Sequence, residues 1–146
     1  MKYALALLAV LIAVATTPAL AADRVQATVS CKPAGVSLAY TCIFKLTNAS
    51  TGAPLEKAQL SIGADMPSMP LAHNVPPVTA KATGAPGEYR ALVVLEMHGD
   101  WALRLRVGGP LKDQLVEVLN FTPQAVGPPA RKAVSPGPAA KPGHKH

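Results

Sequence analysis

The sequence lacks the motifs on which most enzyme active sites are built. Its 146 residues contain no G-x-S-x-G nucleophile elbow, no H-E-x-x-H zinc helix and no glycine-rich phosphate loop. Aspartate and glutamate together number eight, and they are scattered along the chain rather than paired. Nucleophilic catalysis would need a serine or cysteine beside a positioned histidine, and no such set stands out. We therefore expect a protein that is not an enzyme.

Long apolar segments are missing too, apart from one run at the amino terminus. This run covers residues 4–15, follows a single charge at Lys2 and precedes the triplet Ala-Leu-Ala at residues 19–21. A membrane anchor would need about 20 apolar residues, so the run is too short for one. The small-residue triplet fits the A-x-A pattern of signal peptidase. Residues 1–21 are predicted to be a signal peptide, cleaved after Ala21, which makes the mature protein periplasmic or secreted with no transmembrane segment.

Acidic residues are absent from the last part of the chain. Between residues 22 and 123, nine Lys and Arg stand against eight Asp and Glu. Residues 124–146 hold four basic residues, namely Arg131, Lys132, Lys141 and Lys145. This segment is rich in Pro, Ala and Gly and cannot bury enough apolar surface to offset the entropy of ordering. We expect a disordered basic tail that touches an anionic membrane surface weakly, and a domain at 22–123 without a nucleic-acid-binding patch.

Cysteine is scarce as well, with Cys31 and Cys42 as the two representatives. In an oxidising compartment such a pair usually forms a disulfide. Closing a loop of about a dozen residues stabilises by about 3 kcal/mol in the chain-entropy model. The alternative is a thiol pair that binds a metal or carries redox chemistry, but the spacing is not C-x-x-C. A structural disulfide is favoured.

The sequence does contain a period-two alternation of apolar and polar residues from Arg24 to Phe121, which is typical of half-buried strands. Clusters of Gly, Pro and Asn separate the alternating segments. Seven strands are expected, starting near Val25, Cys42, Ala58, Val78, Tyr89, Trp101 and Gln114. The fourth is expected over residues 78–83. The pattern predicts an all-β fold, a small immunoglobulin-like β-sandwich of about seven antiparallel strands.

Methionine and histidine gather in two places. The predicted ligand set is Met66, Met69 and His73 in a proline-rich loop and Met97 and His98 in a turn. Thioether and imidazole groups together favour soft metals, copper(I) above all. If consecutive strands run antiparallel, the loop and the turn leave the sandwich at the same end. Two more histidines, His144 and His146, lie at the end of the tail.

Each of these residues also has a purely structural interpretation. Met97 shares its alternating face with Leu95 and Trp101, so it fits a core position. Met66 and Met69 could close the open end of the sandwich, since methionine fills irregular gaps well. The metal site and the packing role both stay open at the level of sequence.

Residues 55–107 resemble the YtkA-like domain, which also occurs in proteins of the FixH family. The resemblance depends on three features. They are the segment Pro54-Leu55-Glu56-Lys57-Ala58 that leads into a strand, the loop Met66-Pro67-Ser68-Met69 with His73, and the hairpin Gly87-Glu88-Tyr89 leading to Met97-x-Gly99-x-Trp101. The hairpin is the most specific of these features.

The resemblance implies a small exported sandwich associated with heavy-metal efflux, copper delivery or oxidase assembly. It implies metal-transport or oxidase-assembly proteins of the cell envelope as partners, and copper(I) as the bound ion. The chain departs from the FixH pattern because it has no retained amino-terminal membrane helix, which favours a periplasmic protein. The alternative function is a non-catalytic envelope interaction module with no bound ligand.

Overall fold

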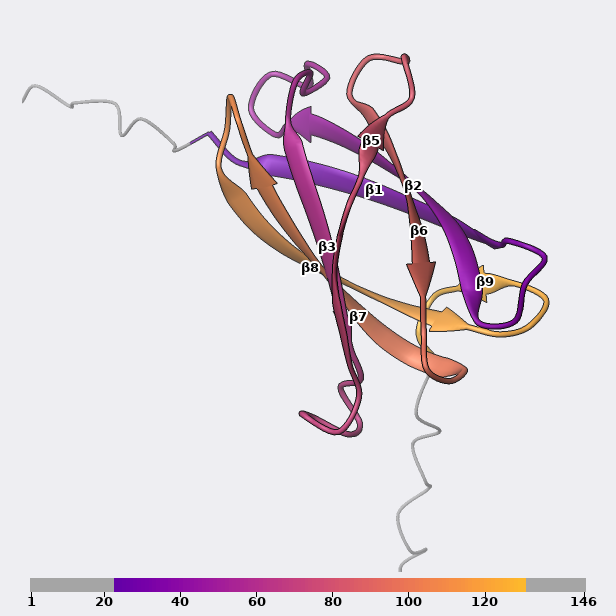
Figure 1. The fold of residues 1–146 in the computed structure, drawn as a ribbon. Coiled ribbons are helices and arrows are strands. Elements are labelled where there is room, and N and C mark those ends of the chain that lie inside the picture. The colour runs from indigo at the N-terminus through magenta and orange to yellow at the C-terminus, as the bar shows by residue number, and fades with distance from the viewer. Residues whose placement is uncertain (1–22, 131–146) are drawn as a thin grey trace, which may run out of the picture.

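The computed structural model describes residues 23–130, which form two antiparallel β-sheets packed as a sandwich (Figure 1). The strands are β1 (Val25–Pro33), β2 (Ala39–Asn48), β3 (Gln59–Asp65), β4 (Asn74–Thr79), β5 (Lys81–Ala82), β6 (Glu88–Val94), β7 (Gly99–Gly108), β8 (Asp113–Phe121) and β9 (Val126–Gly127). The all-β sandwich is confirmed. Seven strands have six or more residues, and β5 and β9 have two each. The predicted signal peptide and the tail beyond residue 130 lie outside the described residues.

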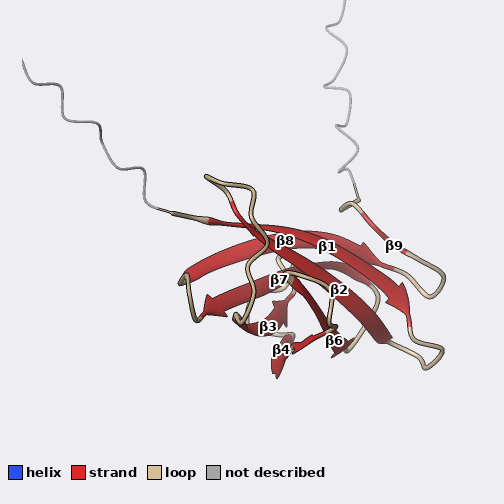
Figure 2. Ribbon diagram, turned by 90° about the horizontal axis from the view of Figure 1, so that it is seen from above, coloured by secondary structure: helices blue, strands red, loops and turns tan. Residues whose placement is uncertain are grey.

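The two sheets draw on strands that are far apart in the chain. Sheet A has the order β1-β2-β6-β5, and sheet B has the order β4-β3-β7-β8-β9. Figure 2 shows strands and loops alone over the described residues. No helix that could cross a membrane is found in residues 23–130.

The core lies between the sheets and is built from the inward-facing half of each alternating strand. Its largest fully buried side chains are Trp101, Tyr40, Phe44 and Phe121. Tyr40 of sheet A and Phe121 of sheet B meet edge to face, with ring centroids 4.9 Å apart. This aromatic contact and the aliphatic side chains around it hold the layers together.

The expected fourth strand was wrong in its bounds, because the chain changes sheets within it. β4 pairs with β3 in sheet B, whereas β5 pairs with β6 in sheet A. At the crossing, the Ala80 N–H bonds to the Leu60 carbonyl at 2.9 Å. Pro76 and Pro77 fit in β4 because it is an edge strand, where missing N–H donors cost little.

The domain also continues past Pro123, where the tail was expected to begin. The chain turns back after Thr122, whose backbone N–H and side-chain hydroxyl both donate hydrogen bonds to the Ala125 carbonyl. Val126 and Gly127 then pair with Phe121 and Asn120 at the edge of sheet B. Strand pairing thus extends four residues beyond the expected boundary at Pro123, because composition alone conceals a short edge strand.

The predicted disulfide is confirmed. Cys31 of β1 and Cys42 of β2 are direct partners in the strand register, and their sulfur atoms are bonded. The bond joins the edge strand of sheet A to its neighbour.

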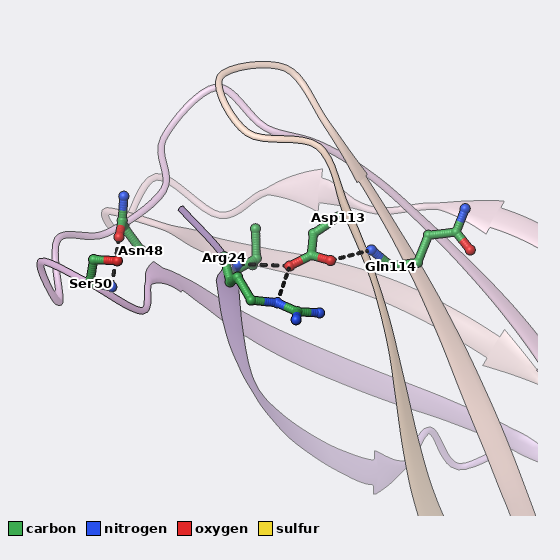
Figure 3. Close-up of polar contacts among 6 residues, drawn as sticks. Arg24, Asn48, Ser50, Asp113 and Gln114 are labelled. Carbon is green, nitrogen blue, oxygen red and sulfur yellow. Dashed lines mark hydrogen bonds and ion pairs between the residues drawn. The ribbon is translucent and has the colours of Figure 1, made fainter. Parts of the chain in front are cut away.

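A second tie connects β1 to the other sheet (Figure 3), at the end of the sandwich that Figure 1 shows far from residues 66–73. Asp113, at the start of β8, accepts a hydrogen bond from the Val25 N–H at 2.9 Å. It accepts another from the Gln114 N–H at 2.8 Å, and the Arg24 guanidinium lies 3.9 Å away. The Val25 N–H chiefly, with help from Gln114 and Arg24, holds the pKa of the Asp113 carboxyl below its usual value of 3.8.

Candidate functional site

The loop that carries two of the predicted methionines, here the 66–73 loop, is a compact turn structure. β3 ends at Asp65, just before the first of the loop's prolines. The loop then closes on itself, with the Met66 N–H bonded to the His73 carbonyl at 3.4 Å and the Met69 N–H bonded to the Met66 carbonyl at 3.1 Å. These bonds bring the backbones of Met66, Met69 and His73 close together.

The 95–98 turn joins β6 of sheet A to β7 of sheet B, and it contacts the 66–73 loop. The His73 Nδ1 lies 2.6 Å from Glu96 Oε2. A Cβ atom placed on Gly99 would lie 3.0 Å from Met66 Cε, so the absence of a side chain at Gly99 lets the methionine approach. The expectation that the two segments share an end of the sandwich is confirmed by these contacts, and Figure 1 shows both below the body of the sheets.

The three methionines differ in exposure. Met66 is 5% exposed and belongs to the buried core. Met97 is half-buried and packs against that core, while its carbonyl accepts a hydrogen bond from Trp101 Nε1 at 3.0 Å. Met69 is 38% exposed. A ligand from solution therefore meets Met69 first.

His98 faces a different part of the molecule. Its side chain is exposed and lines a hollow with residues 33–40 of the β1–β2 turn and with Pro123. Four of the five predicted ligands thus lie in the 66–73 loop or in the part of the 95–98 turn that packs toward the core. The fifth, His98, also belongs to the turn, but its side chain faces the β1–β2 turn. Sequence spacing misses this because neighbouring residues of a turn point in different directions.

The His73–Glu96 pair has a definite chemical consequence. A carboxylate is an acceptor, so the imidazole nitrogen that faces it, Nδ1, carries the proton. The neutral ring then has its lone pair on Nε2. Metal-binding histidines usually have this arrangement, in which a carboxylate fixes the ring and its tautomer. Glu96 was not among the predicted site residues, and no sequence signal links it to a partner 23 positions away.

Within the described part of the chain, no group of three or more His, Cys, Asp and Glu side chains is placed to hold a metal ion. A site at this end would therefore depend on thioether sulfur as well as on His73. His144 and His146 lie outside the described residues.

The other two motifs have clear packing roles, one at the opposite end of the sandwich, where β3 and β6 begin, and one at this end. Tyr89 donates its hydroxyl proton to the Leu55 carbonyl at 2.8 Å and accepts the Ala58 N–H at 2.9 Å. Gly87 lies against the backbone of Leu46 and the ring of Pro54. The Gly-x-Tyr motif therefore anchors the segment 54–58, and Trp101 anchors the 95–98 turn.

Comparison with known proteins gives one result. The model of the YtkA-like family matches residues 20–106, which is more than half of the chain. No curated protein and no solved structure matches significantly.

Proposed function

The chain belongs to the YtkA-like family, and we propose that this member is an exported protein that binds a soft metal ion. Copper(I) is the ion that its thioether and imidazole donors prefer. Its role would be accessory, in metal efflux or in the assembly of a metalloprotein of the cell envelope. Export is proposed from the leader at residues 1–21, and the Cys31–Cys42 disulfide is consistent with an oxidising compartment.

The His73–Glu96 contact is the observation that carries the proposal. It orients the imidazole of His73 so that the lone pair on Nε2 is available to a metal ion. The ring lies at the end of a loop that contains two methionines. His73 has 29% of its side chain exposed, and Met69 is 38% exposed. Met69 and His73 are therefore proposed as the first ligands, with Met66 and Met97 behind them. His98 is left out of this set because it lines another hollow.

The packing of Met66 favours a second candidate function. A thioether that is 5% exposed within an apolar core is fully explained by its packing. In this alternative the 66–73 loop closes the end of the sandwich, the His73–Glu96 pair fastens it to the 95–98 turn, and the protein is an envelope interaction module without a ligand.

A copper(I) titration of the mature chain distinguishes the two. For this titration, every variant also carries His144→Gln and His146→Gln, so that the histidines of the tail cannot bind copper(I). A chromophoric chelator competes with the protein for the ion. We expect Met69→Leu to weaken copper(I) binding about tenfold, because it removes a soft donor and conserves volume. Leu71→Ala is the matched control, since Leu71 is 93% exposed in the same loop and has no donor atom.

Glu96→Gln tests the role of the carboxylate. The amide can present a donor to Nδ1 and allows the other tautomer, so we expect copper(I) affinity to fall about 10- to 100-fold, the range for loss of an orienting partner. Equal affinities for the parent chain, Met69→Leu and Glu96→Gln would contradict the metal-binding proposal and favour the interaction module. Intact mass of the exported protein, with a start at Ala22, tests the leader separately.

A further inference from the structure

Positive charge is concentrated on the outer face of sheet A. Four cations point outward from four strands of this sheet, namely Lys32 on β1, Lys45 on β2, Lys81 on β5 and Arg90 on β6. All four are exposed. We call this surface the basic face.

The strand register shows that these residues share one side. Lys81 pairs directly with Arg90, and Arg90 pairs with Ile43. Cys42 and Phe44, the neighbours of Ile43 in β2, are buried on the opposite side in the core. Because side chains alternate along a strand, Lys45 lies on the side of Ile43 and so faces outward.

The charges of the described domain are segregated. The basic face has four cations and one carboxylate, that of Glu88, which lies 4.0 Å from Lys45 Nζ, so its net charge is +3. The other described residues have five Lys and Arg against seven Asp and Glu, a net charge of −2. The sum of +1 hides the segregation in the sequence, because the four cations come from four separate strands.

Two exposed aliphatic side chains accompany the cations. Leu92 and Val94 on β6 are 54% and 52% exposed, although most side chains of their size in the domain are buried. Leu92 lies in register with Thr41, which pairs with Lys32 on its other side, so Leu92 is on the same face as the cations and two residues from Arg90 along β6. Exposed apolar groups among charges indicate a contact surface.

We propose that the basic face is a docking surface for an anionic lipid bilayer. The charges are spread over an open sheet rather than gathered in a cleft, which suits a broad planar surface of phosphate groups. Lysine and arginine near such a surface are attracted to it in proportion to their number. The chain leaves the domain at Ala130 with four further cations and no acidic residue ahead of it, so the tail adds attraction of the same sign. This inference does not depend on metal binding.

Vesicle sedimentation with the mature full-length chain tests the proposal. The vesicles contain about 30% phosphatidylglycerol in phosphatidylcholine, at about 50 mM salt, where exposed charges are weakly screened. The test variant is Lys32→Gln, Lys81→Gln and Arg90→Gln together. The matched control, Lys57→Gln, Arg106→Gln and Lys112→Gln, removes the same charge from other surfaces. If each lost charge on the basic face weakens vesicle binding about fivefold, three lost charges weaken it about 100-fold, which is the result that we expect for the test variant. We expect the control variant to bind within about threefold of the parent chain.

The contribution of the tail to vesicle binding is distinguished from that of the basic face by repeating the comparison in a chain whose four tail cations are replaced by Gln. The difference between the two triple variants is expected to persist there. The proposal is overturned if the triple variants bind equally, if the parent chain binds pure phosphatidylcholine as well as the anionic vesicles, or if the difference vanishes without the tail charges. Retention of the parent chain, but not the test variant, on immobilised poly-glutamate without any vesicle binding would also overturn it, and would assign the face to an acidic protein surface. Far-ultraviolet circular dichroism of both variants confirms that they fold.

Discussion

Gly87 is the residue whose identity the fold constrains most visibly. A Cβ atom there would lie 2.7 Å from the Leu46 carbonyl oxygen and 2.9 Å from Pro54 Cβ, and the backbone has a φ of 67°. Both contacts involve groups that the sandwich holds in place, and the Leu46 N–H bonds to the Gly87 carbonyl at 2.8 Å. The close approach of these two segments therefore depends on a missing side chain.

Gly87→Ala is predicted to lower the free energy of unfolding by about 3 kcal/mol, because it combines a left-handed backbone with a clash against backbone atoms. Gly52→Ala is the matched control, since Gly52 has a φ of 71° and nothing within 4 Å of its Cβ position. It carries the conformational penalty alone, about 1 kcal/mol. Urea denaturation of both variants measures the difference, and equal losses would show that the contact is not tight.

At the scale of the element, the edge strand β1 is held from both sides. The disulfide bonds it to β2 within sheet A, and the Asp113 carboxylate binds its first N–H from sheet B. Long edge strands are a hazard for aggregation unless they are covered or tied. These two attachments keep β1 in register along its length.

The Asp113 tie gives a prediction on pH. Its pKa is lowered in the folded state, so ionisation stabilises the fold above pH 3.8, the value in the unfolded chain, and this stabilisation is lost as pH falls through the lower folded pKa. Asp113→Asn is expected to cost about 1 to 2 kcal/mol at neutral pH. Parent and variant should converge in stability well below pH 3.8.

Chemical denaturation at neutral and acidic pH measures this convergence. Arg24→Gln is the control, because the Val25 N–H is the leading cause of the lowered pKa and Arg24 the least. That variant should retain most of the pH dependence of the parent chain. A stability difference between parent and Asp113→Asn that is the same at both pH values would contradict the assignment.

At the scale of the whole molecule, the domain closes with residues beyond Pro123. Val126 packs against the core, the Tyr40 hydroxyl donates to the Thr122 carbonyl at 2.9 Å, and the Ala130 N–H donates to Asp100 Oδ1 at 3.1 Å. These contacts bring the end of the described chain back to the start of β7. The segment 124–130 is thus part of the folded unit.

Two truncations test this boundary. A chain that ends at Ala130 is predicted to unfold at the same temperature as the mature protein. A chain that ends at Pro123 loses β9 and the packing of Val126, and we expect it to be less stable by about 1 to 3 kcal/mol. Differential scanning calorimetry of the three chains measures the effect. Equal melting temperatures for both truncations would place the boundary at Pro123 instead.

The sequence by itself determined the class of the fold and the pairing of its cysteines. Alternation at period two, interrupted by Gly and Pro clusters, is a local property that each strand carries whatever its partners are. Cys31 and Cys42 lie at mirrored positions around one turn, so their meeting needs no knowledge of the other sheet. The alternating direction of consecutive strands likewise predicted that the 66–73 loop and the 95–98 turn leave the sandwich at the same end.

The tertiary structure alone decided which side chains meet. β2 pairs with β6 and β3 with β7, across long stretches of chain, and these long-range pairings set the change of sheet at Ala80 and the +3 charge of the basic face. They also bring Glu96 to His73 and turn His98 toward the β1–β2 turn. Alternation states that a residue faces inward or outward, but the neighbour it faces depends on strand order and on the direction of each turn, which no local pattern contains.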